Sequence, residues 1–94
     1  ICDYVKNDGW SVTKDPKGRV GPYASKRDQW VSYDDVSDVM RKTELIKELN
    51  LGGGMIWSID LDDFKNLCNC GKYPLLAALN RGLERTLGHA TDCT

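Results

Sequence analysis

Hydrophobic side chains recur at steps of three and four residues in the middle of the chain, over residues 35–49. This spacing places them on one face, which predicts an amphipathic helix. Asp34 or Asp35 can cap its first turn, and the segment Asn50-Leu51-Gly52 provides its end. The recurring positions are Val36, Val39, Met40, Thr43, Ile46 and Leu49.

A short and almost wholly apolar segment follows at residues 55–59. Strands of this kind are buried on both faces, which is typical of parallel sheets covered by helices. Tyr73-Pro74 then opens a second helix, predicted over residues 73–87 and closed by Gly88, because Pro suits the first helical turn. The order helix, strand, helix predicts an α/β unit. The leucine stripe of the second helix consists of Leu75, Leu76, Leu79, Leu83 and Leu87.

The first third of the chain, residues 8–33, has a different pattern. Trp10 and Val12 alternate with polar Ser11 and Thr13, and a second β-prone run covers residues 29–33. Between them, Asp-Pro-Lys-Gly at residues 15–18 is a turn signal, since Pro presets one backbone angle and Gly accepts a positive one. These features predict a small antiparallel meander without a helix.

The charge balance excludes two classes of partner. With 13 basic and 14 acidic residues, the net charge of −1 attracts neither nucleic acid nor an anionic membrane over long range. No apolar run approaches the roughly 20 residues of a membrane span. The chain starts at Ile1 with no initiator Met and no signal peptide, and we interpret it as a cleaved or excised segment.

The four cysteines, Cys2, Cys68, Cys70 and Cys93, fit disulfides in an oxidising, extracellular compartment. Their number allows three connectivities, and the spacing alone does not choose among them. A zinc site is the alternative. We favour disulfides and predict no metal, because Cys68 and Cys70 are separated by one residue and His89 is the only histidine.

Trp57 lies near the end of the predicted strand, where ligands meet parallel α/β structures. By the two-residue period of a strand, Met55, Trp57 and Ile59 share one face. An indole on this face is a flat apolar platform of the sort on which sugars stack. The alternative is that Trp57 fills a core, and the sequence pattern leaves both interpretations open.

Three carboxylates, Asp60, Asp62 and Asp63, follow the predicted strand. Paired acids in such a loop could perform general acid–base chemistry. More often, residues of this kind cap the next helix or stay solvated, and we favour that interpretation. A calcium loop is disfavoured, because the segment lacks the glycine turn and the later Glu of such loops.

Four segments resemble the C-terminal part of the family 18 glycoside hydrolases, the chitinases and chitinase-like proteins. They are ICDYVKNDGW, GPYASKRDQWVSYDDV, LGGGMIWSIDLDDF and GKYPLLAALNRGL. Their order and spacing match over nearly the whole chain. The segments LCNCGKYPLL and DPKGRVGPY look most like arthropod chitinases.

The resemblance implies a (β/α)8 TIM barrel with a small α+β insertion domain after its seventh strand. Residues 1–33 would be the later part of the insertion domain. Residues 34–94 would be the last barrel helix, strand and helix with the C-terminal tail, and the eighth strand would cover residues 53–60. Trp57 would lie under the sugar ring at the cleavage point of chitin or a chito-oligosaccharide, with Met55 and Leu61 as pocket-lining neighbours.

The resemblance also implies a disulfide pairing. The family joins a cysteine of the insertion-domain helix to one after the eighth strand, which corresponds to Cys2 with Cys68. Cys70 and Cys93 would then pair with each other.

One absence limits the chemistry. The family's acid motif, D-x-x-D-x-D-x-E on the fourth strand, does not occur in the chain, and DLDD at residues 60–63 lacks the Glu. The chain therefore supplies no catalytic proton donor, and the family reaction requires no cofactor. Two hypotheses stay open: a C-terminal piece of an active chitinase, or a piece of a non-catalytic chitinase-like lectin. A third, weaker hypothesis is an independent disulfide-stapled protein.

Overall fold

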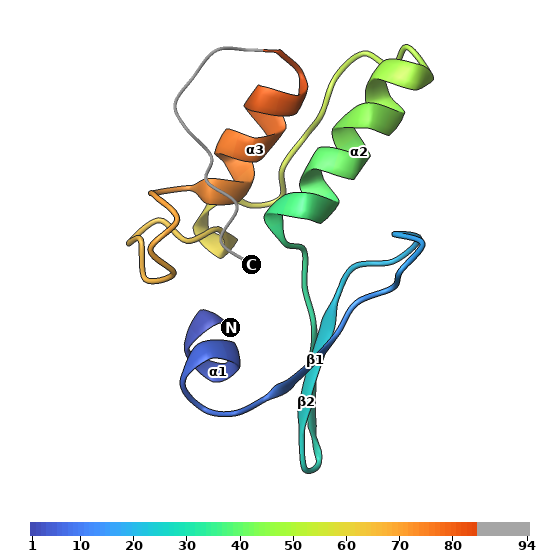
Figure 1. The fold of residues 1–94 in the computed structure, drawn as a ribbon. Helices are drawn as coiled ribbons and strands as arrows, with labels where there is room; N and C mark the ends of the chain where they lie inside the picture. Colours follow the sequence, from blue (N-terminus) through green and yellow to red (C-terminus); the bar gives the residue numbers. More distant parts are fainter. Residues whose placement is uncertain (85–94) are drawn as a thin grey trace.

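The structure is a computed structural model, and it describes residues 1–84. Two helices lie side by side at one end of the molecule, and a small sheet with a short helix lies at the other (Figure 1). The elements in chain order are α1 (Cys2–Lys6), β1 (Ser11–Thr13), β2 (Tyr23–Lys26), β3 (Gln29–Ser32), α2 (Val36–Glu48), the 3-10 turn η1 (Ile59–Leu61) and α3 (Pro74–Gly82).

The meander predicted over residues 8–33 is confirmed. Its three strands form an antiparallel sheet in the order β1-β2-β3, with Val12 opposite Ala24 and Ala24 opposite Val31. Ala24, in the central strand, has no exposed surface. The predicted turn at residues 15–18 is also present, since the Gly18 N–H donates to the Asp15 carbonyl and Gly18 has φ +63°.

Helix α2 matches the predicted amphipathic helix to within one residue at each end. Asp35 is its N-cap and forms a capping box, in which the Asp38 N–H donates to the Asp35 carboxylate at 2.8 Å. At the other end Asn50 adopts the left-handed conformation with φ +51°. The Asn50 and Leu51 N–H groups donate to the carbonyls of Lys47 and Ile46, which completes a Schellman motif.

Helix α3 is shorter than the predicted helix, since it ends at Gly82 rather than at residue 87. Leu83 is its C-cap, and Glu84 has φ +61°, a left-handed conformation that cannot continue a helix. Leu87 and Gly88, which belonged to the predicted helix and its end, lie outside the described residues.

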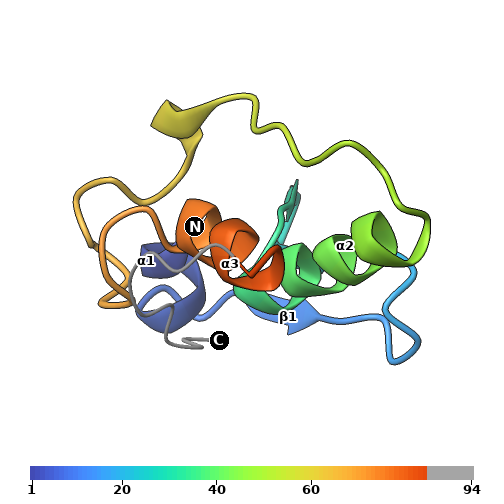
Figure 2. The ribbon, with the colours of Figure 1, turned by 90° about the horizontal axis from the view of Figure 1, so that it is seen from above.

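The strand predicted over residues 55–59 is not formed within residues 1–84. Residues 53–58 run without regular structure, and η1 begins at Ile59. Figure 2 shows this segment arching away from the end of α2 before it reaches η1. The physical reason is that a strand requires a hydrogen-bonded neighbour, and the sheet of the described residues contains only β1, β2 and β3.

Helix α1 was not predicted by periodicity, because five residues are too few to show a helical repeat. The resemblance did imply a helix that carries Cys2, and α1 is that helix. None of the helices within residues 1–84 has the length and apolarity required to cross a bilayer.

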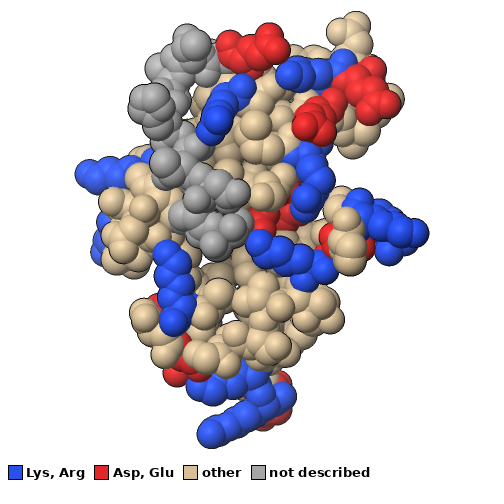
Figure 3. Space-filling model, viewed as in Figure 1, with Lys and Arg blue, Asp and Glu red and all other residues tan. Residues whose placement is uncertain are grey.

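The apolar core of the described residues is small. Ala24, Cys70 and Ala78 are its fully buried hydrophobic members, whereas large apolar side chains between residues 49 and 67 stay exposed. Lys and Arg are interspersed with Asp and Glu on the face drawn in Figure 3, in agreement with the net charge of −1.

Candidate functional site

The segment 53–58 has one face toward the helices and one face away from them. A Cβ added to Gly54 would lie 2.9 Å from Leu79 Cδ1 of α3 and 3.5 Å from Ile46 Cδ1 of α2. Gly54 therefore marks the face toward the helices. Met55 and Trp57 are exposed by 79% and 85%, whereas Ile56 between them is half-buried. The alternation predicted for a strand thus persists in its side chains, although no strand pairing is present.

The three predicted binding residues border a common hollow of about 810 Å³. Met55 and Trp57 come from the extended segment, and Leu61 comes from η1, where its side chain is 77% exposed. Ile46 of α2 and Leu79 of α3 form part of the apolar wall of this hollow. Within the described residues Trp57 fills no core, and its indole is open to a ligand or to the surfaces of a larger domain.

Polar groups line the end of the hollow that is formed by residues 32–34, which the sequence reasoning did not identify. Burial, and then the nearby charges of Asp35 and Asp38, raise the pKa of the Tyr33 hydroxyl above its usual value. Lys42 Nζ lies 2.9 Å from Asp34 Oδ1 and also borders the hollow. In the sequence, this group corresponds to Tyr33 and Asp34 directly before the helix, where the pattern indicates only a helix cap at Asp34 or Asp35.

The carboxylates after the segment have structural partners. Asp62, which is 8% exposed, accepts hydrogen bonds from the Leu75 and Leu76 N–H groups at the start of α3. Asp63 accepts from the backbone N–H groups of Leu67 and Cys68 at 2.9 and 2.8 Å. Capping of the following helix is therefore confirmed for Asp62, and the Asp63 carboxylate holds the turn at residues 67–68.

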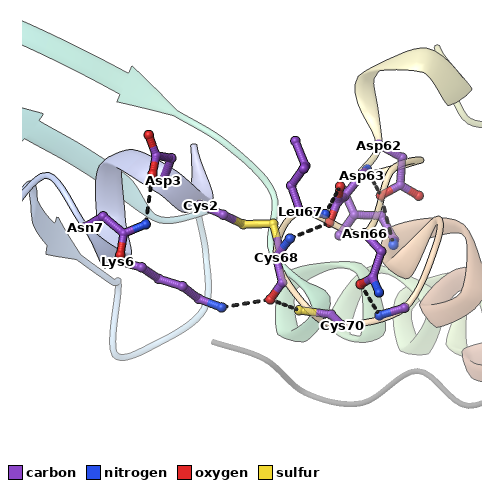
Figure 4. The surroundings of a disulfide bond; sticks show 12 residues. Cys2, Asp3, Lys6, Asn7, Asp62, Asp63, Asn66, Leu67, Cys68 and Cys70 are labelled. Atoms are coloured by element: carbon purple, nitrogen blue, oxygen red, sulfur yellow. Dashed lines mark hydrogen bonds between the residues drawn. A yellow bond between two sulfur atoms is a disulfide. The ribbon is translucent and has the colours of Figure 1, made fainter.

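The disulfide between Cys2 and Cys68 is confirmed (Figure 4). It joins α1 to the loop before α3 across a sequence separation of 66, and the two Cα atoms are 5.5 Å apart. Lys6 Nζ donates to the Cys68 carbonyl oxygen at 2.8 Å, so a hydrogen bond reinforces the covalent link. Cys93 lies outside the described residues, and its pairing with Cys70 stays a prediction.

Comparison with known proteins places these features in a family. Residues 1–62 match the sequence profile of the glycosyl hydrolases family 18. Probable chitinase 10 of Drosophila melanogaster is 53% identical over 94 residues, which cover 99% of this chain and 4% of that protein.

Solved structures agree with the sequence match. Catalytic domain 2 of the Group II chitinase of Ostrinia furnacalis, in complex with (NAG)5, superposes with a TM-score of 0.92 and 47% identity, over 99% of this chain and 24% of that one. Human YKL-39, described as a pseudo-chitinase with retained chitooligosaccharide binding, gives a TM-score of 0.79 and 48% identity, over 88% of this chain and 22% of that one. The chain thus spans a small part of the relatives it matches. It belongs to family 18 of the glycosyl hydrolases, close to the insect chitinases, and corresponds to a segment of the catalytic domain.

Proposed function

We propose that this chain contributes one wall of a cleft for chitin or chito-oligosaccharides in a secreted chitinase-type glycoside hydrolase. The observation that carries the proposal is the exposed Trp57, which borders the same hollow as the exposed Met55 and Leu61. An indole presents a flat apolar face to the C–H groups of a pyranose ring, and the two aliphatic neighbours extend that face. Two relatives that share this segment are solved with chito-oligosaccharides, which supports the ligand class.

The role of this chain within the whole hydrolase follows from the residues that the chain contains. The parent protein, meaning the whole hydrolase of which this chain would be a segment, would hydrolyse β-1,4 links between N-acetylglucosamine units with retention. In that reaction a Glu on the fourth strand protonates the glycosidic oxygen, and the N-acetyl group of the substrate attacks the anomeric carbon. The chain lacks that motif, so its part is to bind the sugar and exclude water beneath it. The isolated chain is therefore inactive.

The organisation of the parent is part of the same proposal. Residues 1–33 belong to an insertion domain and residues 34–94 to the end of the barrel. The close association of the three strands with one another, and of α2 with α3, supports this boundary. The disulfide between Cys2 and Cys68 supports an oxidising, extracellular location.

A non-catalytic lectin is the second candidate, because human YKL-39 is 48% identical to this chain and is described as a pseudo-chitinase. Binding residues on this segment would serve both functions equally. The fourth strand of the parent separates them: a Glu at the end of the acid motif makes the parent a hydrolase, and a neutral residue makes it a lectin.

The binding role is tested with Trp57→Ala in the intact parent. Loss of the indole should weaken chito-oligosaccharide binding by roughly 1–3 kcal/mol, the scale of a buried aromatic contact. Isothermal titration calorimetry measures the affinity, and circular dichroism verifies the fold. Trp30→Ala, which removes an exposed tryptophan from β3, is the matched control. Unchanged affinity in a folded Trp57→Ala protein would refute the binding role.

A further inference from the structure

The carboxylate of Asp62 connects the loop that carries Leu61 to the start of α3. Asp62 Oδ2 accepts from the Leu76 N–H at 2.9 Å, and Oδ1 accepts from the Leu75 N–H at 3.2 Å. Oδ1 also accepts from the N–H of Asp63 at 2.8 Å. Asp62 is 8% exposed, so these bonds lie in a largely water-excluded position.

Helix α3 depends on this contact, because its own first residues provide no cap. Tyr73, at the N-cap position, has φ +54° and makes no side-chain capping bond. Pro74 carries no N–H, so Leu75 and Leu76 offer the first backbone donors of the helix. Both donate to Asp62, whose negative charge also suits the positive end of the helix dipole.

The loop that carries Asp62 is connected through its backbone to the proposed sugar-binding surface. The Asp62 N–H donates to the Ile59 carbonyl at 3.2 Å, and the Leu61 N–H donates to the Ser58 carbonyl at 2.9 Å. These bonds close η1, which begins two residues after Trp57. A hydrogen-bonded turn thus connects Trp57 to Asp62, and the Asp62 carboxylate links that turn to α3.

We propose that Asp62 is a positioning residue for carbohydrate binding, which holds Leu61 and Trp57 in the orientation that receives the sugar. The inference rests on the proposed function of the Trp57 surface. This role of Asp62 goes beyond ordinary helix capping, because the carboxylate orients the ligand-binding segment and also stabilises the start of α3.

The neighbouring carboxylates provide matched controls. Asp60 is exposed, and its carboxylate accepts a hydrogen bond from the Ser58 hydroxyl. Asp63 directs both carboxylate oxygens to the later turn at Leu67 and Cys68. Asp63→Asn therefore changes the same charge one residue away, without removing the bonds between η1 and α3.

The first test compares Asp62→Asn with Asp63→Asn in the intact parent. Asn keeps one acceptor oxygen, but its NH2 group opposes a backbone N–H at the second position. Asp62→Asn should weaken binding of chitotetraose roughly fivefold by calorimetry, and Asp63→Asn should weaken it less than about twofold. Equal affinities for wild type and a folded Asp62→Asn protein would overturn the positioning role.

A double-mutant cycle separates positioning from a general loss of stability. In a background of Trp57→Ala and Leu61→Ala, Asp62→Asn should have less than about a twofold effect on affinity, since nothing remains to be positioned. The same fivefold loss in both backgrounds would overturn the proposal. If Trp57→Ala alone leaves the affinity unchanged, the proposed function fails first, whatever Asp62→Asn does.

Amide hydrogen exchange of the unaltered parent provides a test that needs no variant to fold. Saturating chitotetraose should slow exchange at the Leu75 and Leu76 amides, because fixing the loop also fixes their acceptor. The Leu67 and Cys68 amides, which are held by Asp63, should change little. Exchange at Leu75 and Leu76 that is unaffected by bound sugar would contradict the proposed coupling.

Discussion

Thr43 of α2 and Gly82 of α3 lie in direct contact. A Cβ at position 82 would come within 2.0 Å of the Thr43 hydroxyl oxygen and 2.7 Å of its methyl carbon. Thr43 is 1% exposed, and its hydroxyl donates to the Met40 carbonyl at 2.6 Å, so the side chain has little room to yield. The spacing of the two helices therefore requires glycine at this point.

Gly82→Ala should destabilise the parent despite the higher helix propensity of Ala. Overpacking against a fixed neighbour costs roughly 1–3 kcal/mol, which exceeds the gain of up to about 1 kcal/mol from propensity. Chemical denaturation measures the difference. Gly52→Ala, at a position with no atom within 4 Å of the added carbon, is the control and should be near neutral. A neutral Gly82→Ala would show that the helices separate easily.

Removal of the disulfide should cost substantial stability. Because the bond closes a separation of 66 residues, the chain-entropy estimate for replacing both Cys2 and Cys68 with Ala is about 4 kcal/mol. Denaturation of the oxidised parent and the double variant measures the loss.

Peptide mapping under non-reducing conditions checks the connectivity. It should recover Cys2 joined to Cys68 and Cys70 joined to Cys93. A peptide that links Cys2 to Cys93 would contradict both assignments.

Asp15 should titrate at unusually low pH. The Arg19 guanidinium, followed by the Lys17 and Arg19 N–H groups, holds the pKa of Asp15 at about 2, below its usual 3.8. Because the folded pKa is lowered, the stabilisation is present above the usual value and is lost as the pH falls from about 4 toward 2. Carboxyl-carbon NMR titration measures the midpoint. Arg19→Gln should move it toward 3.8, and an unmoved midpoint would exclude Arg19 as the main cause.

The isolated chain should self-associate through the exposed apolar side chains of residues 55–61. Met55, Trp57 and Leu61 are exposed by 77–85%, and residues 53–58 lack strand partners within the described structure. Analytical ultracentrifugation should show dimers or larger species, and Met55→Ser with Leu61→Ser should reduce them. A sharp, monomeric NMR spectrum of the unaltered chain would contradict this expectation, and turnover of chitotetraose would contradict its predicted inactivity.

Features that depend on nearby residues could be predicted from sequence. The periodicity of residues 36–49 predicts α2, and alternation with the 15–18 turn predicts the meander. The two acidic residues before the helix predict a cap at Asp34 or Asp35, and the structure has Asp35 in that position. Features that depend on residues far away in the chain could not be predicted from sequence. The strand at residues 55–59 needs neighbours that the described residues do not contain, and the pattern does not single out Asp62 from Asp60 and Asp63 as the carboxylate that caps α3.

The residues of the candidate site also fall into those that the local pattern predicts and those that only the fold reveals. Alternation alone placed Met55 and Trp57 on one face, and the structure keeps them there. Tyr33 and Lys42 reach the hollow from other elements, and only the fold reveals that approach. The pairing of Cys2 with Cys68 came from the family resemblance, since spacing leaves three connectivities open.

The bond between Cys2 and Cys68 also makes most of the chain a covalent ring. A protease that cuts once between residues 3 and 67, for example at the exposed turn around Lys17, opens the ring without releasing a fragment. The two pieces migrate together until the disulfide is reduced. A nicked protein can therefore keep α1, the sheet and the Trp57 segment in one molecule, so proteolysis and loss of binding need not coincide.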